Sequence, residues 1–137
     1  NDILFNEKKI SGILLELYEG YLIIGIGLNI ESSPNFHQFS RDATCINEYD
    51  ANININMMLL KILNNIQTQI NILATKGFAG LQKRLNKNLY KVGEEVQINY
   101  LGSKFTGKLI EVVENGELVL EIENQHKNFK IGEVFDL

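Results

Sequence analysis

The sequence predicts an α+β protein in which apolar strands come first, two helices follow and a small β-barrel ends the chain. Two β-rich apolar runs, Ile10–Tyr18 and Tyr21–Ile30, are separated only by Glu19-Gly20, which favours an antiparallel hairpin. Apolar residues then recur at spacings of three and four across Asn52–Thr75, as in an amphipathic helix. From Lys91 onward, short alternating runs broken by glycines favour a barrel of short strands.

The first part of the chain is expected to form a sheet. Ile3–Phe5 is a short apolar segment that precedes a polar turn. Ile13–Leu15 is apolar on both parities, as in a strand that is covered on both faces. Glu31–Asp50 is polar, contains the only proline, Pro34, and shows no period, so we expect a long loop of the functional or mobile kind.

Two helices are expected in the middle of the chain. The first has a single apolar stripe, made of Ile55, Leu59, Ile62, Leu63, Ile66, Ile70 and Leu73. Asn52 or Asn54 is a candidate N-cap of this helix, and Gly77 is a candidate C-terminal stop. A second, shorter helix is expected over Phe78–Leu89.

Short strands are expected in the last third of the chain. They are Val96–Tyr100, Phe105–Val113, Leu118–Ile122, Asn128–Ile131 and Val134–Leu137. Asn115-Gly116 is a strong signal for a two-residue hairpin. Leu118, Leu120 and Ile122 are expected to share a buried face, with Val119 on the mostly solvated one. The change of pattern divides the chain into a domain over residues 1–89 and a second over residues 90–137.

The composition limits the classes of function. The chain has 137 residues, 45% apolar and 22% charged, which fits one domain, or one small domain with part of another. A net charge of −4 without a basic stripe argues against partners such as nucleic acids or anionic membranes. The single cysteine, Cys45, suits a reducing compartment. No apolar run reaches the roughly 20 residues that span a bilayer, and no signal peptide is visible, so a cytoplasmic location is expected.

The start of the chain is unusual. It opens on Asn1-Asp2 without an initiating Met, and a strand-like pattern is already under way at Ile3. This suggests a fragment or a processed chain.

The second run of the hairpin carries the clearest functional pattern. Gly25, Gly27 and Asn29 share one parity, and each glycine weakens a strand by roughly 0.5–1 kcal/mol relative to Ala. Two glycines on one face leave a trough in which a ligand can approach the backbone, and Gly12 on the preceding strand would widen it. A crowded contact between a helix and the sheet explains the same glycines, so the pattern leaves both interpretations open.

Few polar residues near this hairpin are candidates for chemistry. Lys9 opens the first strand and has the point charge that suits carboxylate or phosphate oxygens, although a solvated turn lysine beside Lys8 is the simpler interpretation of the pattern. Asn1-Asp2 fits ordinary turn chemistry. His37 and His126 have no partner at metal-ligand spacing, so no metal site is expected.

Together these residues resemble the bacterial biotin–protein ligase family. Asn1-Asp2 and the tract Lys9–Glu16 (KISGILLE) are similar to the family's Trp-Pro-Asn-Asp and Lys-(Ile/Leu)-x-Gly-Ile-Leu-x-Glu tracts, without the Trp-Pro. Gly25–Asn29 (GIGLN) resembles the family's Gly-x-Gly-x-Asn tract, and Ala43–Ile46 approximates its Ala-Thr-Ser-Leu tract. Two helices and a small barrel then follow in the family's order, so the resemblance covers the whole chain.

The resemblance implies a fold and an activity. Residues 1–89 would form the carboxy-terminal part of a class II synthetase-like mixed sheet with helices, and residues 90–137 a small Src-homology-3-like β-barrel. The implied enzyme is biotin–[acetyl-CoA-carboxylase] ligase. It forms biotinyl-5′-adenylate from biotin and ATP with Mg²⁺, and then biotinylates a lysine of the biotin carboxyl carrier protein, its expected partner. The resemblance also allows a homodimer.

The resemblance assigns roles to particular residues. Lys9 would offset the repulsion between the biotin carboxylate and the α-phosphate, and Asp2 would orient or deprotonate the acceptor amine. The glycines would floor the pocket, and Ala43–Ile46 would serve its adenine side. The expected biotin- and adenylate-binding residues are Asn1, Lys9, Gly12, Ile13, Gly25, Gly27, Leu28 and Asn29.

Parts of the family's pattern lie outside this sequence. A Gly-Arg-Gly-rich loop that wraps biotin and phosphate would precede Asn1, and the tail Gly132–Leu137 lacks the arginine that often reaches ATP in the family. Two alternatives therefore stay open. One is a non-catalytic, truncated or split-ligase fragment that acts as a binding module. The other is a lipoate–protein ligase-like protein, although the Gly-x-Gly-x-Asn tract and the barrel favour biotin.

Overall fold

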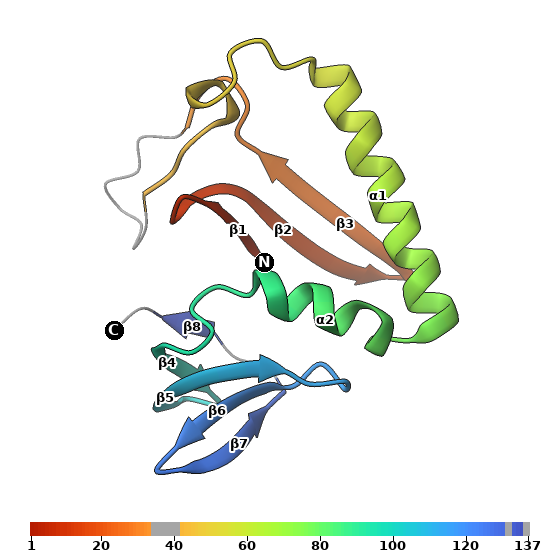
Figure 1. Cartoon of the computed structure of the whole chain (residues 1–137). Coiled ribbons are helices and arrows are strands. Elements are labelled where there is room, and N and C mark those ends of the chain that lie inside the picture. Colours follow the sequence, from red (N-terminus) through yellow and green to blue (C-terminus); the bar gives the residue numbers. More distant parts are fainter. Residues whose placement is uncertain (34–41, 131–132, 136–137) are drawn as a thin grey trace. The chain divides into compact units, whose positions relative to one another are not determined.

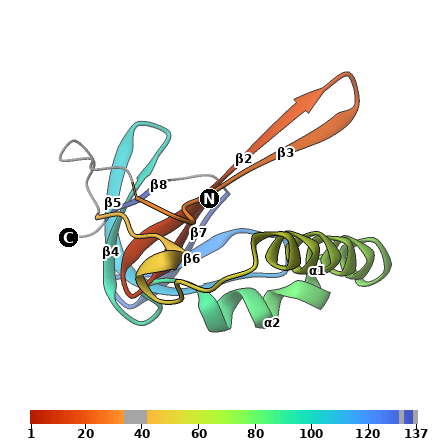
Figure 2. The ribbon, with the colours of Figure 1, turned by 90° about the horizontal axis from the view of Figure 1, so that it is seen from above.

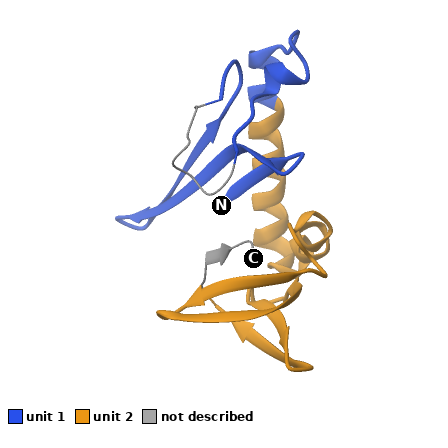
Figure 3. Cartoon of the chain, turned by 90° about the vertical axis from the view of Figure 1, so that its left-hand side faces the viewer, with its two compact units in different colours: residues 1–60 blue, residues 61–137 orange. Residues whose placement is uncertain are grey.

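The structure is a computed structural model that describes residues 1–33, 42–130 and 133–135 (Figure 1). It divides into two compact units, Asn1–Leu60 and Lys61–Leu137 (Figure 3). Each unit contains its own β-sheet. The predicted succession of a sheet, two helices and a second sheet is confirmed. The division into residues 1–89 and 90–137 stays a prediction.

The first unit is built on a three-stranded antiparallel sheet. Its strands are β1 (Asp2–Phe5), β2 (Lys8–Tyr18) and β3 (Tyr21–Leu28), and β2 lies in the centre. The hairpin predicted from the two apolar runs is thus β2–β3. Both connections are two-residue turns, Asn6-Glu7 and Glu19-Gly20, in which every φ angle is positive. This is the turn geometry that matches the twist of antiparallel strands.

The distal half of the β2–β3 hairpin exposes apolar side chains on both faces. On β2, Leu14, Leu15 and Leu17 are 63%, 59% and 78% exposed, and Leu14 has the opposite parity to Leu15 and Leu17. Tyr21 and Leu22 on β3 are also exposed. Figure 2 shows this hairpin as a long twisted ribbon. The expectation that both faces are covered is therefore wrong for the described part of this chain.

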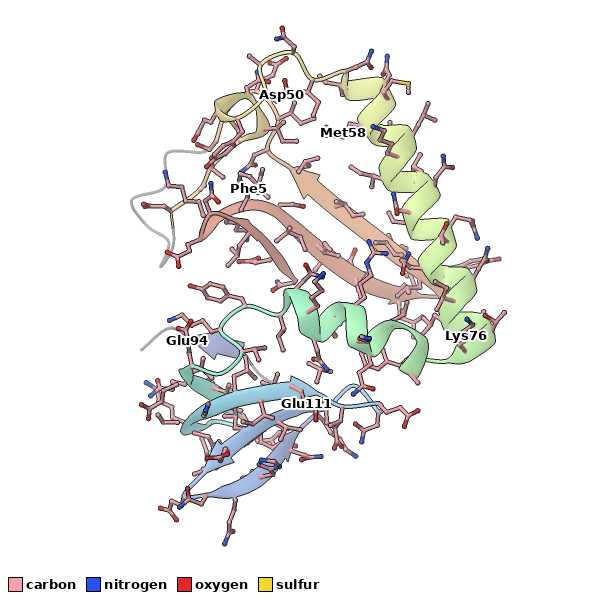
Figure 4. The ribbon with its side chains drawn as sticks, in the orientation of Figure 1. Phe5, Asp50, Met58, Lys76, Glu94 and Glu111 are labelled. Atoms are coloured by element: carbon pink, nitrogen blue, oxygen red, sulfur yellow. The ribbon has the colours of Figure 1, made fainter. Side chains whose placement is uncertain are left out.

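Two helices follow, α1 (Ile55–Lys76) and α2 (Ala79–Asn88). Asn54 is the N-cap of α1, because its Oδ1 accepts the backbone N–H of Met57 at 3.0 Å. Gly77 ends the helix with a φ of +65°, and its N–H donates to the carbonyl of Leu73. The expected caps are thus confirmed. Figure 4 labels Met58 and Lys76 near the two ends of α1.

The second unit holds a five-stranded antiparallel sheet with the order β7-β6-β5-β4-β8. The strands are β4 (Glu95–Tyr100), β5 (Ser103–Val112), β6 (Leu118–Ile122), β7 (Gln125–Phe129) and β8 (Glu133–Phe135). Its buried core consists of Val96, Ile98, Leu109, Leu120 and Phe129. Apolar burial of this kind, at roughly 25 cal/mol per Å², is the main source of stability in a small unit.

Helix α2 is joined to this sheet by the amide of Asn86. Its Nδ2 donates to the carbonyl of Val112 at 2.9 Å, and its Oδ1 accepts the N–H of Val112 at 2.8 Å. One side chain thus satisfies both backbone groups of a residue at the end of β5.

Two details of the second sheet differ from expectation. Asn115-Gly116 lies in a longer connection, in which Val113 donates to the carbonyl of Glu117 and Gly116 donates to that of Val113. The two-residue hairpin predicted there is wrong, because five residues separate β5 from β6 and the bond from Val113 to Glu117 encloses three of them. Val119 is also buried, at 4% exposed, rather than solvated.

Gly107 on β5 provides a direct test of this packing. A Cβ at this position would lie 2.6 Å from the backbone oxygen of Glu121 and 2.7 Å from Cγ1 of Ile122. We therefore expect Gly107→Ala to lower the free energy of unfolding by about 1–3 kcal/mol, as overpacking does. Denaturant unfolding of the 137-residue chain would measure the change. The matched control is Gly27→Ala, because no described atom lies within 4 Å of a Cβ at Gly27. Equal stability of the two variants would contradict the prediction.

Candidate functional site

Lys9 and Asp2 form an ion pair at the start of the first sheet. The Nζ of Lys9 lies 2.7 Å from Oδ1 of Asp2, and the side chains are 43% and 38% exposed. A pair this exposed contributes little to stability, typically about 0–1 kcal/mol. Both groups are open to a ligand.

An irregularity in β2 determines the face of the sheet on which the Lys9 side chain lies. The register pairs Ile3 with Ser11 but Leu4 with Lys9, so Ile10 is an extra residue on β2. Without this bulge, Lys9 and Gly12 would project to opposite faces, because side chains alternate along a strand. With it, the end of the Lys9 side chain lies against Gly12: a Cβ there would be 3.5 Å from Cε and 3.6 Å from Nζ. Bulges are known to redirect side chains in this way.

A row of register partners crosses the three strands beside this ion pair, and its members on β2 and β3 are glycines. Asp2 is the register partner of Gly12, and Gly12 is the register partner of Gly27. Gly25 lies two residues along β3 on the same face, opposite Leu14. The predicted trough therefore exists as a surface of bare backbone, with the Lys9 ammonium and the Asp2 carboxylate at one end.

The other expected binding residues are placed around this row. Asn1 accepts the backbone N–H of Ile13 at 2.8 Å, which fixes the start of β1. Ile13 and Leu28 have the opposite parity to Gly12 and Gly27, so on this face they present only backbone. Leu28 instead lines an open hollow of about 550 Å³ whose other lining residues are Asn29, Ile30, Glu31, Ser32, Ser33 and Ile55.

The loop after β3 returns to pair with β2 at Lys9. Lys9 donates its N–H to the carbonyl of Asp42 at 2.8 Å and accepts the N–H of Thr44 at 2.9 Å. Lys9 and Ala43 thereby form a parallel bridge. Asn29 holds the same loop, because its Nδ2 donates to the carbonyl of Thr44 at 3.0 Å and its own carbonyl accepts the N–H of Ile46. The tract Ala43–Ile46, expected near the ligand, is thus beside Lys9.

Side chains also secure this loop, and sequence reasoning missed them. Thr44 is fully buried, and its Oγ1 donates to Oε2 of Glu48 at 2.7 Å. Cys45 is 3% exposed, and its thiol points to Oε1 of the same Glu48 at 3.8 Å. These contacts fold the 3₁₀ turn η1 (Ile46–Glu48) back on the bridge. The available sequence signal was a hydroxyl residue four positions before a glutamate inside a loop without periodicity.

The ring of Tyr49 extends this packing to β1. It meets the ring of Phe5 edge-on, with centroids 4.5 Å apart (Phe5 is labelled in Figure 4). Ser11 on β2 is buried and donates to the carbonyl of Gly27 at 2.7 Å. In the described residues of the first unit, only Ser11, Thr44 and Cys45 are buried, so its best-packed region is the surroundings of Lys9.

The described residues contain no cluster that could hold a metal ion and no helix that could cross a membrane. Residues 1–33 and 42–130 contain no group of three or more His, Cys, Asp or Glu placed to hold a metal ion. His126 lies 3.9 Å from Glu121 at an exposed position, and His37 and Pro34 fall outside the described residues. Neither α1 nor α2 is long and apolar enough to cross a membrane.

Comparisons of the sequence and of the structure with known proteins find ligases of one type. No family model matches the sequence. The bifunctional ligase/repressor BirA of Bacillus subtilis is 29% identical over 129 residues, covering 88% of this chain and 40% of that protein. The apo biotin protein ligase of Aquifex aeolicus superposes with a TM-score of 0.87 at 29% identity, over 98% of this chain and 62% of that chain. The same ligase in complex with biotin and ATP gives 0.86 at 31% identity, over 98% of this chain and 58% of that chain.

The fold of this chain, including the lysine-bearing sheet, matches that of solved ligases. More specifically, the homologues of this chain are biotin–protein ligases, and the match lies in their carboxy-terminal part. The resemblance predicted from the motifs is confirmed. The chain spans 40% of the length of the curated relative and about 60% of the solved ligases.

Proposed function

We propose that this chain contributes part of the active site of a biotin–protein ligase, with Lys9 as its catalytic cation. The observation that carries the proposal is the position of the Lys9 ammonium over the bare backbone of Gly12, next to Gly27. A flat ligand can approach such a floor closely, and a cation fixed at its end suits an anion. The Aquifex ligase that this chain matches has been solved with biotin and ATP.

The first step joins two anions. A carboxylate oxygen of biotin attacks the α-phosphorus of ATP, the bond to the β-phosphate breaks, and pyrophosphate leaves. Lys9 would bind between the carboxylate and the α-phosphate, where it offsets their repulsion and stabilises the charge that develops in the transition state. Mg²⁺ would arrive with the ATP phosphates, since Mg²⁺ in such sites is held largely by substrate oxygens and water.

The second step transfers biotin to protein. The ε-amine of a lysine on a biotin carboxyl carrier protein attacks the acyl carbon of biotinyl-5′-adenylate, and AMP leaves. Asp2 is suited to orient this amine or to take its proton, because its carboxylate already binds the ammonium of Lys9 at 2.7 Å. We further propose that the five-stranded sheet of the second unit is the small Src-homology-3-like barrel of these ligases, and that the active form can be a homodimer.

Replacing the cation tests the proposal directly. In the complete gene product, we expect Lys9→Ala to lower the rate of pyrophosphate release with biotin and ATP by roughly 100- to 1,000-fold, the scale of one lost electrostatic contact in a transition state. The fold should survive because the Lys9 side chain is half exposed and its backbone pairing remains. The matched control is Lys8→Ala, an exposed neighbour on the same strand. Near-normal pyrophosphate release from Lys9→Ala would refute the role.

The floor can be tested apart from the charge. Gly27→Ala adds a methyl group where the described chain leaves open space, so stability should not change. If biotinyl-5′-adenylate lies over this row, the methyl group should weaken its binding by about tenfold, or about 1.4 kcal/mol. Calorimetry on the complete gene product would measure it. Unchanged affinity would place the ligand elsewhere.

The second candidate function is a non-catalytic interaction module. Its supporting observation is the exposure of Leu17 and Tyr21, at 78% and 75%, on a hairpin that is apolar on both faces. Contiguous apolar surface of this kind marks sites where another polypeptide binds. A module of a split ligase would bind its partner here without binding substrate by itself.

Binding of biotin to the 137-residue chain tests whether these residues form a complete pocket, which an enzyme needs and an interaction module does not. Because the trough and the cation occupy only one sheet and the matched ligases are longer, we expect this chain to bind biotin weakly or not at all. Isothermal calorimetry with biotin is the measurement. Tight, stoichiometric binding would show that the pocket is complete in these residues and would exclude a purely structural module.

A further inference from the structure

We propose that Thr44 and Glu48 are positioning residues that hold the backbone of Lys9 in the place its side chain needs. The inference rests on the proposed function, in which Lys9 is the catalytic cation. It assigns a task to two residues that do not touch the glycine row themselves. The observations that carry it are the hydrogen bonds between β2 and the segment Asp42–Thr44.

The backbone of Lys9 is held from both sides. On one side it is the register partner of Leu4 on β1, next to the bulge at Ile10. On the other side it lies between Asp42, which accepts its N–H, and Thr44, which donates to its carbonyl. A bulge interrupts the regular ladder on its own edge, so the second edge has to define the backbone there. β3 ends at Leu28, and beyond that point the Asp42–Thr44 segment lies beside β2 instead.

The segment is held in turn by the buried hydroxyl of Thr44. Its 2.7 Å bond to Oε2 of Glu48 joins the residue that binds the Lys9 carbonyl to the end of the η1 turn. Oε1 of Glu48 lies 3.8 Å from the Cys45 thiol, so one carboxylate holds two consecutive loop residues. A hydrogen bond with an ionised acceptor is stronger than a neutral one. Asn29 binds only the backbone of the loop. The side-chain clamp on Thr44 is therefore Glu48, with the Tyr49 hydroxyl as a second and longer contact at 3.4 Å from Oγ1.

The variant Thr44→Val separates positioning from folding. Valine keeps the buried branched shape and the backbone N–H, and the released carboxylate of Glu48 is exposed and can bind water. In the complete gene product, we expect hydrogen exchange at the amides of residues 9 and 44 to accelerate about tenfold. The kcat of adenylate formation should fall by about tenfold while the KM for biotin stays unchanged, because misplacement of a catalytic group lowers the chemical step.

Conservative variants give the internal checks. Thr44→Ser keeps the hydroxyl and should restore both exchange and kcat, and Glu48→Gln keeps a carbonyl acceptor and should lie near the natural protein, whereas Glu48→Ala should behave like Thr44→Val. The matched control is Thr68→Val on α1, whose hydroxyl donates only to the carbonyl of Asn64 at 2.8 Å. It should change neither readout.

The outcomes separate this inference from the proposed function. Slow exchange at residues 9 and 44 in Thr44→Val, or fast exchange with an unchanged kcat, would overturn the positioning role even if Lys9→Ala is inactive. A fall in kcat that Thr44→Ser does not reverse would overturn it as well. Full activity of Lys9→Ala would refute the proposed function instead, and the exchange rates would still show whether the clamp orders residue 9.

Discussion

One extra residue in β2 determines which side chains share a face of the first sheet. Ile10 shifts the register between β1 and β2, and this shift brings the Lys9 ammonium to the face that carries Gly12 and Gly27. Without it, the cation and the bare backbone would lie on opposite sides of the sheet. Lys9, next to this bulge, makes the ion pair with Asp2 and the backbone pairing with Ala43, and its side chain lies at the end of the glycine row.

The two units owe their order to different forces. The second unit has an apolar core around Ile98, Leu109 and Leu120, each 1% exposed or less. In the first unit, the described buried residues are a serine, a threonine and a cysteine, and the loop is held by directional hydrogen bonds. Such bonds fix geometry more sharply than apolar contact does, although each contributes only about 0.5–1.5 kcal/mol to stability. A site that must hold a charged group in place benefits from that difference.

The exposed hairpin sets a condition on both candidate functions. Leu14 and Leu15 project to opposite faces and are both more than half exposed. Strands with apolar side chains on both faces are typical of sheets that are covered on both faces, but the described residues of this chain leave the hairpin uncovered. A ligase that uses Lys9 and a module that binds a partner would therefore both act with further polypeptide against this hairpin. The two functions differ in whether that polypeptide completes a pocket.

The sequence by itself determined the order of the elements, the β2–β3 hairpin, the caps of α1 at Asn54 and Gly77, and the alignment of glycines on one face of β3. These follow from local periodicity and turn chemistry. It did not determine the bulge at Ile10, because the strand pattern is the same with or without an extra residue. Nor did it predict the clamp between Thr44 and Glu48, which forms only when an aperiodic loop returns to β2. The position of the Lys9 ammonium against Gly12 was thus decided by long-range backbone pairing, which local sequence does not encode.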